Sequence, residues 1–231
     1  MAGDQRQFVN FLFCKVDPQW LFLPDEERRQ GKEKFLEVVE AFSPRVLVVS
    51  YTTLGIRADA DLMLWRISED LDLFSEMSAQ FLNAGLGKYL RTAYSYLSMT
   101  KTSVYVSEHQ HEGQEGTRVR LVTPGKKRYL FVYPFVKIRD WYRLDVKTRQ
   151  EMMNQHIRVG HKYPSVKLNT TYSFGLDEQE FVVAFESDKP GDFLDLVMDL
   201  RETEASSYTA RDIPTFTCIR KNLREILDSL G

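Results

Sequence analysis

Four side chains with useful chemistry lie close together in the sequence, at Tyr133, Lys137, Trp141 and His156. A phenol and an imidazole can serve one-electron chemistry at iron, because the imidazole can ligate the metal and the phenol can be oxidised. A lysine ammonium group can hold an anionic substrate. The stretch therefore indicates iron chemistry on an anion, carried by a strand that leads into a helix.

His156 is the candidate metal ligand. On the expected helix Met152 and Met153 lie one turn before it and Gly160 one turn after it, so its neighbours are soft or small. Such a face leaves room for a flat group, and an imidazole there can be the axial ligand of a haem iron. A histidine packed at the edge of the core explains the same spacing, and it is the more common case.

Tyr133 and Lys137 share one face of the expected strand. Phe131, Tyr133 and Phe135 alternate along this strand, and Lys137 continues the same face. An aromatic strand face is usually core, and a lysine at its end either extends to solvent or meets an anion.

The rest of the sequence offers few alternatives for catalysis. His109, His111 and Glu112 resemble a metal-binding cluster, but their polar segment contains no cysteine and is better explained as a solvated loop. Cys14 and Cys218 stand far apart in apolar runs, which predicts buried free thiols in a reducing, cytoplasmic setting. No phosphate loop, nucleophile elbow or Cys-x-x-Cys motif is present.

The composition limits the class of protein. The 231 residues are enough for one large domain or two small ones. The 31 basic and 33 acidic residues nearly balance, which argues against nucleic acid and against an anionic membrane surface as partners. There is no signal-peptide pattern and no apolar run long enough for a membrane span. A neutral chain can still hold a small anion in a local cationic pocket.

The expected elements repeat in the two halves of the chain. In the first half, apolar periodicity predicts a strand Phe8–Val16, a helix Glu26–Phe42, strands Arg45–Thr53 and Asp61–Ile67, a helix Glu69–Ala84 and a strand Thr102–Ser107. In the second half it predicts a strand Tyr129–Lys137, a helix Val146–His161, strands Val166–Phe174 and Glu180–Glu186, a helix Gly191–Glu204, a strand Pro214–Ile219 and a last helix Leu223–Leu230.

Both halves thus follow the order β-α-β-β-α-β, which predicts an α+β protein of two ferredoxin-like units. The two units can set their sheets face to face or form a dimeric α+β barrel with the helices outside the sheets, and either removes exposed strand edges. We expect an N-terminal unit at 1–107, a flexible linker or lid at 108–127 and a C-terminal unit at 128–231 that carries the site.

The motifs Tyr-Pro-Phe-Val-Lys, Asp-Trp-Tyr, Gln-His and Lys-Tyr-Pro, in this order from Tyr133 to Pro164, resemble the chlorite dismutase family. Within it, the chain most resembles the coproheme decarboxylases that finish haem b synthesis. The resemblance covers nearly the whole chain. It implies a homopentamer of dimeric α+β barrels whose C-terminal units hold an iron porphyrin.

The resemblance also implies roles for single residues. His156 matches the axial iron ligand, Tyr133 the tyrosine that becomes a radical, and Lys137 the lysine beside the reactive propionate. It places further residues around the porphyrin: Arg201 and Ser206 as propionate ligands, and Trp141, Met153 and Asn169 in the pocket, with Asn169 at the distal position above the iron.

Two positions depart from the chlorite-degrading members of the family. Those members carry an arginine at the distal position, where this chain has Asn169. They also place a glutamate behind the axial histidine, at a position that corresponds to Ala205 or, after a one-residue shift, to Glu204. Both departures argue against chlorite chemistry.

The implied activity is oxidative decarboxylation of two propionates of ferric coproheme, which is substrate and cofactor at once. Hydrogen peroxide drives the reaction through a radical on Tyr133, the propionates become vinyl groups and the product is haem b. Ferrochelatase is then the expected upstream partner. The alternatives are a chlorite dismutase or haem peroxidase of the same superfamily, a non-catalytic haem-binding or delivery protein, and a ferredoxin-like structural domain without porphyrin.

Overall fold

The computed structural model describes residues 6–103, 105 and 121–231. By their internal contacts these residues divide into two compact units. The N-terminal unit combines Gln7–Leu97 with Phe216–Gly231, and the C-terminal unit combines Arg6 with the described residues of Ser98–Thr215, so that it includes the last two residues of the strand Leu90–Met99. The last segment of the chain, which the sequence pattern assigns to the second half, therefore packs with the first.

The N-terminal unit has the ferredoxin-like order β1-α1-β2-β3-α2-β4. Its elements are β1 (Phe8–Val16), η1 (Pro18–Phe22), α1 (Asp25–Phe42), β2 (Leu47–Thr52), β3 (Leu62–Ser68), α2 (Asp72–Leu82), η2 (Gly85–Tyr89), β4 (Leu90–Met99), β9 (Phe216–Arg220) and α6 (Leu223–Asp228). The strands lie in the order β4-β1-β3-β2-β9. Both β1 and β2 pair antiparallel with β3, and β9 pairs antiparallel with β2.

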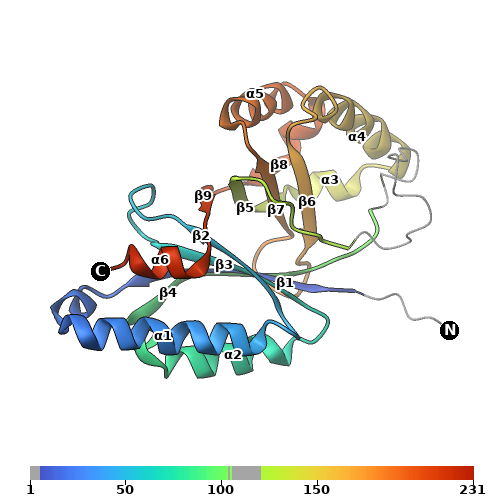
Figure 1. Ribbon diagram of the computed structural model, residues 1–231. Helices are drawn as coiled ribbons and strands as arrows, with labels where there is room; N and C mark the ends of the chain where they lie inside the picture. The colour runs from blue at the N-terminus through green and yellow to red at the C-terminus, as the bar shows by residue number, and fades with distance from the viewer. Residues whose placement is uncertain (1–5, 104, 106–120) are drawn as a thin grey trace. The chain divides into compact units, whose positions relative to one another are not determined.

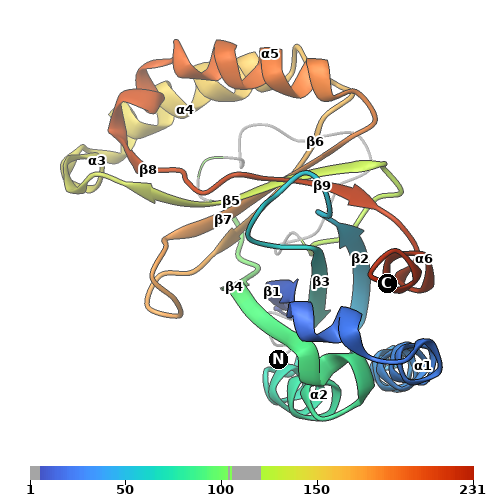
Figure 2. The same ribbon diagram turned by 90° about the vertical axis from the view of Figure 1, so that its left-hand side faces the viewer.

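One face of this sheet is covered by helices (Figures 1 and 2). Apolar residues one turn apart on α1, among them Phe35, Val39 and Phe42, are buried with residues of β1, β3, α2 and α6 in a single core. The indole Nε1 of Trp20 donates to the carbonyl oxygen of Leu230 at 3.0 Å, which fixes the C-terminal helix to this core.

The C-terminal unit repeats the same order of elements. They are β5 (Tyr129–Lys137), α3 (Arg139–Arg143), α4 (Val146–Gly160), β6 (Lys167–Tyr172), β7 (Phe181–Ser187), α5 (Pro190–Arg201), η3 (Glu204–Tyr208) and β8 (Thr209–Arg211). β7 pairs antiparallel with both β5 and β6, and β5 pairs with β8. The resulting order β8-β5-β7-β6 matches the order β4-β1-β3-β2 of the N-terminal unit.

Helices α4 and α5 cover one face of the C-terminal sheet (Figure 1). Alternate residues of β5 and β7, Phe131 and Phe185, are buried there with Phe193 and Leu196 of α5. The rings of Phe131 and Phe193 stack with their centroids 4.0 Å apart. Alternation along the strands therefore decides which side chains point toward α4 and α5.

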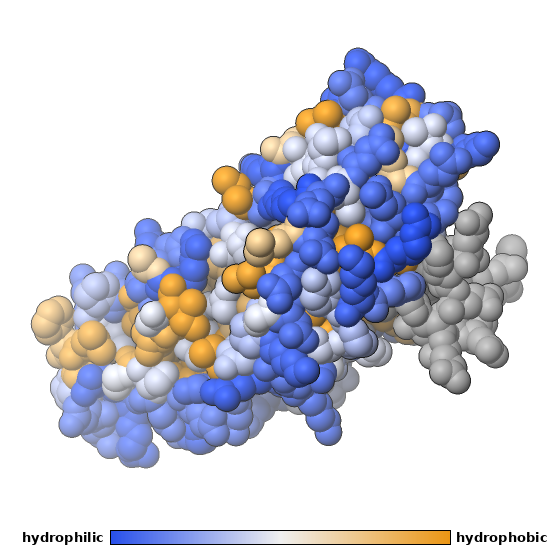
Figure 3. Space-filling view, turned by 90° about the horizontal axis from the view of Figure 1, so that it is seen from above, coloured by the Kyte–Doolittle hydropathy of each residue, from blue (hydrophilic) through white to orange (hydrophobic). Residues whose placement is uncertain are grey.

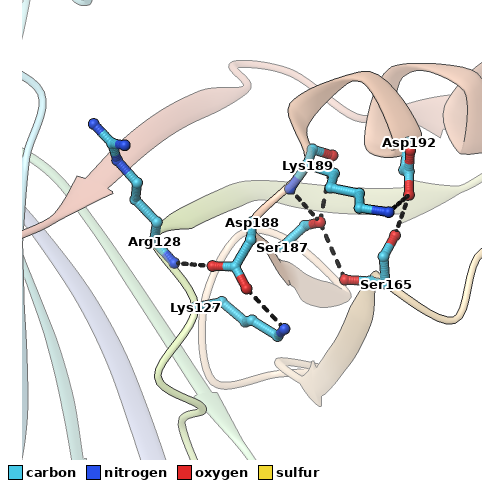
Figure 4. Close-up of polar contacts among 7 residues, drawn as sticks. All are labelled: Lys127, Arg128, Ser165, Ser187, Asp188, Lys189 and Asp192. Carbon is cyan, nitrogen blue, oxygen red and sulfur yellow. Dashed lines mark hydrogen bonds and ion pairs between the residues drawn. The ribbon is translucent and has the colours of Figure 1, made fainter.

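Polar contacts hold the strand ends near the start of α5 (Figure 4). The carboxylate of Asp188 accepts hydrogen bonds from Lys127 Nζ at 2.8 Å and from the Arg128 backbone N–H at 2.9 Å. The hydroxyl of Ser187 lies 3.1 Å from the carbonyl oxygen of Ser165. These contacts join the segments that begin β5, precede β6 and end β7.

The surface in Figure 3 is largely hydrophilic, with hydrophobic side chains exposed in separate patches. Within the described residues, none of the helices combines the length and the apolar character needed to cross a bilayer.

The structure confirms the expected fold class, an α+β protein with antiparallel strands and covering helices. The bounds of β1 and β5 agree with the sequence pattern.

Two expected strands differ from the structure. The strand expected at Thr102–Ser107 is not found in its described residues, and the rest of it lies outside them; the chain forms β4 earlier, at Leu90–Met99. The strand expected near the C-terminus exists as β9, but it joins the N-terminal sheet. Of the expected linker, 108–120 lies outside the described residues.

Candidate functional site

A short turn at the end of α5 organises the candidate site. Helix α5 ends at Arg201, and Thr203 leads into the 3-10 helix η3. The hydroxyl oxygen of Ser206 lies 2.6 Å from the carbonyl oxygen of Arg201 and 2.8 Å from that of Thr203, so it closes the turn. The turn is thereby fixed in a position where neighbouring elements can bond to it.

Lys137 and His156 meet this turn from two different elements. Lys137, the last residue of β5, donates from Nζ to the carbonyl oxygen of Ala205 at 2.5 Å. The Nδ1 atom of His156, on α4, lies 3.2 Å from Oγ1 of Thr203. Trp141 of α3 is buried in one cluster with Ala205. The structure thus brings three of the predicted site residues together, Lys137, Trp141 and His156.

His156 is a neutral imidazole in this environment. Burial, assisted by the positive charge of Lys137, lowers the pKa of His156 from 6.5 to about 4. On the same face of α4, Met152 is buried, Met153 is half-buried, and a Cβ added at Gly160 would meet no atom within 4 Å. A neutral nitrogen donor beside soft side chains and open space could hold the iron of a porphyrin.

Lys137 is a partly desolvated cation. Its Nζ lies 4.5 Å from the centroid of the Trp141 ring and 5.4 Å from that of Phe135. Burial lowers the pKa of Lys137 from 10.5 to about 8, against the opposing effect of the Glu180 carboxylate. An ammonium group with reduced hydration interacts more strongly with a carboxylate than one in open water does.

Tyr133 lies on the same strand face, about 13 Å along β5 from Lys137. Its half-buried ring packs against Phe185 with the centroids 6.1 Å apart. Burial raises the pKa of the Tyr133 phenol, the charge of Asp212 raises it further, and the charge of Arg201 opposes both. The phenol therefore keeps its proton near neutral pH, and its oxidation must release a proton together with an electron.

Arg201 and Ser206, the expected propionate ligands, are engaged with other protein groups. The guanidinium of Arg201 forms an ion pair with Asp212. The side chain of Arg201 is 56% exposed, so a ligand can reach it but must share it with that carboxylate. The hydroxyl of Ser206 is directed at backbone carbonyl groups, so it has no second proton to donate to a propionate.

Asn169 lies on the face of β6 that points away from α4. The register between β6 and β7 puts Leu168 and Thr170 on the face that packs with α4 and α5, and both are exposed. Asn169 is buried on the opposite face, where its Nδ2 donates to Oε1 of Glu186 at 2.9 Å. The distance in sequence from His156 does not report which face of β6 a residue occupies, so the sequence did not point to Leu168 or Thr170.

Glu180 also contacts the candidate site, although the sequence pattern did not point to it. Its Oε2 accepts from the backbone N–H of Lys137 at 2.8 Å and from the hydroxyl of Tyr142 at 2.6 Å. The internal repeat of the sequence could have pointed to Glu180, because Asp61 occupies the corresponding position in the N-terminal unit. There Asp61 accepts from the backbone N–H of Val16, the last residue of β1, at 2.9 Å.

Thr203 and Asp212 were likewise missed, because both act through contacts that connect residues distant in sequence. His109, His111 and Glu112 lie outside the described residues.

Comparisons with known proteins bear on this site. A family profile described as chlorite dismutase matches residues 28–221. The coproheme decarboxylase of Mycolicibacterium smegmatis (strain ATCC 700084 / mc(2)155) is 29% identical over 181 residues, which cover 78% of this chain and 75% of that protein.

Solved structures with a similar fold include a chlorite dismutase and a heme-binding protein. The chlorite dismutase from Candidatus Nitrospira defluvii in complex with imidazole matches with a TM-score of 0.87 and 27% identity, over 96% of this chain and 94% of that one. A heme-binding protein from Thermus thermophilus matches with a TM-score of 0.82 and 24% identity, over 97% and 94% of the two chains. At that identity the second likeness shows the fold alone.

Proposed function

The chain belongs to the chlorite dismutase family, and we propose that it is a coproheme decarboxylase that uses hydrogen peroxide to make haem b. One observation carries the proposal: Tyr133 and Lys137 lie on the strand face that is covered by the helix bearing His156. A neutral iron ligand, a cation for a carboxylate and an oxidisable phenol are thus combined in one unit.

Different residues of the chain would bind the iron and the carboxylates of the porphyrin. His156 would hold the iron of the porphyrin through its free ring nitrogen. Lys137 would bind a propionate, because its ammonium group is partly desolvated and carries its charge below a pKa of about 8. Arg201 would bind a second carboxylate at its exposed side while Asp212 keeps the guanidinium in place.

Tyr133 would act as the hydrogen-atom carrier. The bound iron porphyrin supplies oxidising equivalents taken from hydrogen peroxide. Tyr133 gives up the phenolic proton and one electron, and the resulting tyrosyl radical takes a hydrogen atom from the β-carbon of a propionate. Loss of carbon dioxide and of one further electron leaves a vinyl group. Each decarboxylation thus releases two electrons, which one hydrogen peroxide accepts as it becomes two water molecules.

The side chains of β6 that share the face with α4 support this activity over chlorite degradation. Leu168 and Thr170 are uncharged, so neither can supply the distal arginine expected of chlorite-degrading members of the family. Chlorite dismutase activity is still the second candidate, because chlorite dismutases are among the similar solved structures. Oxygen release on addition of chlorite to the porphyrin-loaded protein would identify it.

The test of the proposal is a titration of the apo-protein with ferric coproheme without oxygen, followed by stepwise addition of hydrogen peroxide. Mass spectrometry of the porphyrin should show two successive losses, each of one carboxyl group with one further hydrogen, ending at haem b. Binding with bleaching but no such mass change would contradict the decarboxylase and favour a peroxidase or a carrier. A homopentameric assembly and a ferrochelatase partner upstream belong to the same proposal.

A further inference from the structure

The Nδ1 atom of His156 has one hydrogen-bond partner among the described contacts, the hydroxyl of Thr203, at 3.2 Å. That hydroxyl also lies 2.7 Å from the carbonyl oxygen of Leu200. Thr203 itself is only 4% exposed, and its backbone N–H donates to the same carbonyl at 3.2 Å. The threonine is therefore held in place at the end of α5.

These distances determine where the protons lie. A hydroxyl has a single proton to donate, and a carbonyl oxygen can only accept. The shorter contact, at the usual length of an O–H···O bond, assigns the threonine proton to Leu200. The oxygen of Thr203 must then accept from His156, which requires a proton on Nδ1. A neutral imidazole with a proton on Nδ1 has its lone pair on Nε2.

We propose that Thr203 is a positioning residue that fixes the proton of His156 on Nδ1 and so keeps Nε2 free to ligate iron, before any porphyrin binds. The consequence for iron rests on the proposed function, whereas the tautomer itself can be measured in the ligand-free protein. The neutral histidine side chain in water favours the other tautomer, with its proton on Nε2. The protein therefore has to impose the tautomer that leaves Nε2 unprotonated.

The chemistry of this partner also sets the strength of the ligand. Glu204 is exposed and Ala205 has no polar side chain, so the partner of Nδ1 is a neutral hydroxyl in place of a carboxylate. A carboxylate would draw the Nδ1 proton toward itself and make the imidazole a stronger donor. A hydroxyl whose own proton is already donated orients the ring and adds little basicity. We expect a comparatively weak iron–histidine bond.

Nitrogen-15 NMR of the ligand-free protein at neutral pH tests the tautomer directly. The signals of His156 are assigned by their loss in His156→Gln. The native protein should show a protonated Nδ1 and an unprotonated Nε2. Thr203→Val, which keeps the shape and removes the hydroxyl, should shift His156 toward the form with the proton on Nε2. Thr203→Ser, which restores a hydroxyl, should return the native pattern.

A matched control separates this effect from a disturbance of the turn. Ser207 belongs to the same 3-10 helix, and its exposed hydroxyl lies 2.8 Å from the carbonyl oxygen of Glu204. Ser207→Ala should leave the signals of His156 unchanged. A native protein with the proton on Nε2, or a Thr203→Val variant with an unchanged tautomer, would overturn the proposal. If Thr203→Val loses stability while the tautomer of His156 stays unchanged, the role of Thr203 is purely structural and the proposal fails.

The porphyrin-loaded protein gives a second readout. Thr203→Val should weaken ferric coproheme binding by about 10- to 100-fold, as is typical when the partner of a metal-ligating histidine is removed. The iron–histidine stretching frequency of the ferrous haem complex should be low in the native protein and should rise in Thr203→Glu. If no porphyrin binds to the native protein, the proposed function fails, while the NMR result still decides the role of Thr203 toward His156.

Discussion

The ammonium nitrogen of Lys137 lies 4.5 Å from the centroid of the Trp141 ring and 2.5 Å from the carbonyl oxygen of Ala205. The lysine is thus held between an aromatic ring and a backbone dipole, and no carboxylate is within hydrogen-bonding distance of its Nζ among the described contacts. Such a cation is desolvated without being neutralised, and the ligand-free protein should bear the energetic cost of this arrangement.

The energetic cost of desolvating the Lys137 ammonium group should appear in the pH dependence of stability. The pKa of Lys137 is about 8 in the folded protein and 10.5 in its ordinary state. Between these values the unfolded chain binds a proton that the folded chain has released, so stability rises with pH. Relative to Lys137→Met, the free energy of unfolding of the native protein should increase by up to about 3 kcal/mol as the pH rises from below about 8 to above 10.5. Urea unfolding of both proteins measures this, and parallel curves would contradict the desolvated cation.

Replacement of Tyr133 should separate binding from turnover. Tyr133→Phe removes the phenolic hydrogen and leaves the packing against Phe185. We expect the variant to bind ferric coproheme with an unchanged Soret spectrum and to form no vinyl product, as seen by mass spectrometry. Tyr129→Phe is a matched control on the same strand, since Tyr129 packs against the same core. A normal product yield from Tyr133→Phe would exclude the radical role.

Glu180 should matter for stability through the end of β5. Its Oε2 accepts from the backbone of Lys137 and from Tyr142. Glu180→Gln removes the negative charge from both bonds and should lower the free energy of unfolding by about 1.5 to 3 kcal/mol. Tyr142→Phe, which removes one of the two bonds and leaves the charged bond to the Lys137 backbone, should cost less. Equal losses in the two variants, measured by urea unfolding, would mean that the backbone bond contributes little.

Asn169 should behave as a structural residue. Asn169→Ala removes the hydrogen bond at 2.9 Å to the buried carboxylate of Glu186, which keeps only the longer ion pair with Lys167 at 3.6 Å, and should destabilise the protein by about 1 to 3 kcal/mol. The spectrum of bound ferric coproheme should not change. Thr170→Val, on the other face of β6, should be nearly neutral for stability and should alter the rate of reaction with peroxide. The reverse pattern would place Asn169 in the porphyrin pocket.

Two glycines should respond differently to alanine. A Cβ at Gly87 would lie 1.6 Å from the backbone oxygen of Phe81, so Gly87→Ala requires the backbone to move. We expect a loss of about 3 kcal/mol or more, measured by thermal unfolding. A Cβ at Gly191, in the first turn of α5, would meet no atom within 4 Å, and Gly191→Ala should stabilise by about 0.5 kcal/mol. Similar melting temperatures for both variants would contradict this contrast.

The sequence by itself determined most of the elements and the repeat of their order in the two halves of the chain. Strands β1 and β5 are nine-residue runs of mostly apolar residues, and α1 carries its apolar residues one turn apart, so the local hydropathy pattern was sufficient to locate these elements. The first five elements of each unit, in the order β-α-β-β-α, followed from this pattern, whereas the last strand of each unit was expected at a different place in the chain. The proximity of Lys137 and Trp141 also followed from the pattern, because the two residues are separated by only a short turn.

The tertiary structure decided what local pattern cannot report. β4 has a mixed burial pattern and no clear alternation, so its position depends on its place beside β1 in the sheet. β9 joins the N-terminal unit because its edge pairs with β2. Asn169 points away from α4 because of the register with β7. Thr203 reaches His156 across 47 residues of sequence because α5 ends beside α4. Each of these depends on which surfaces meet, whereas periodicity reports only which residues share a face.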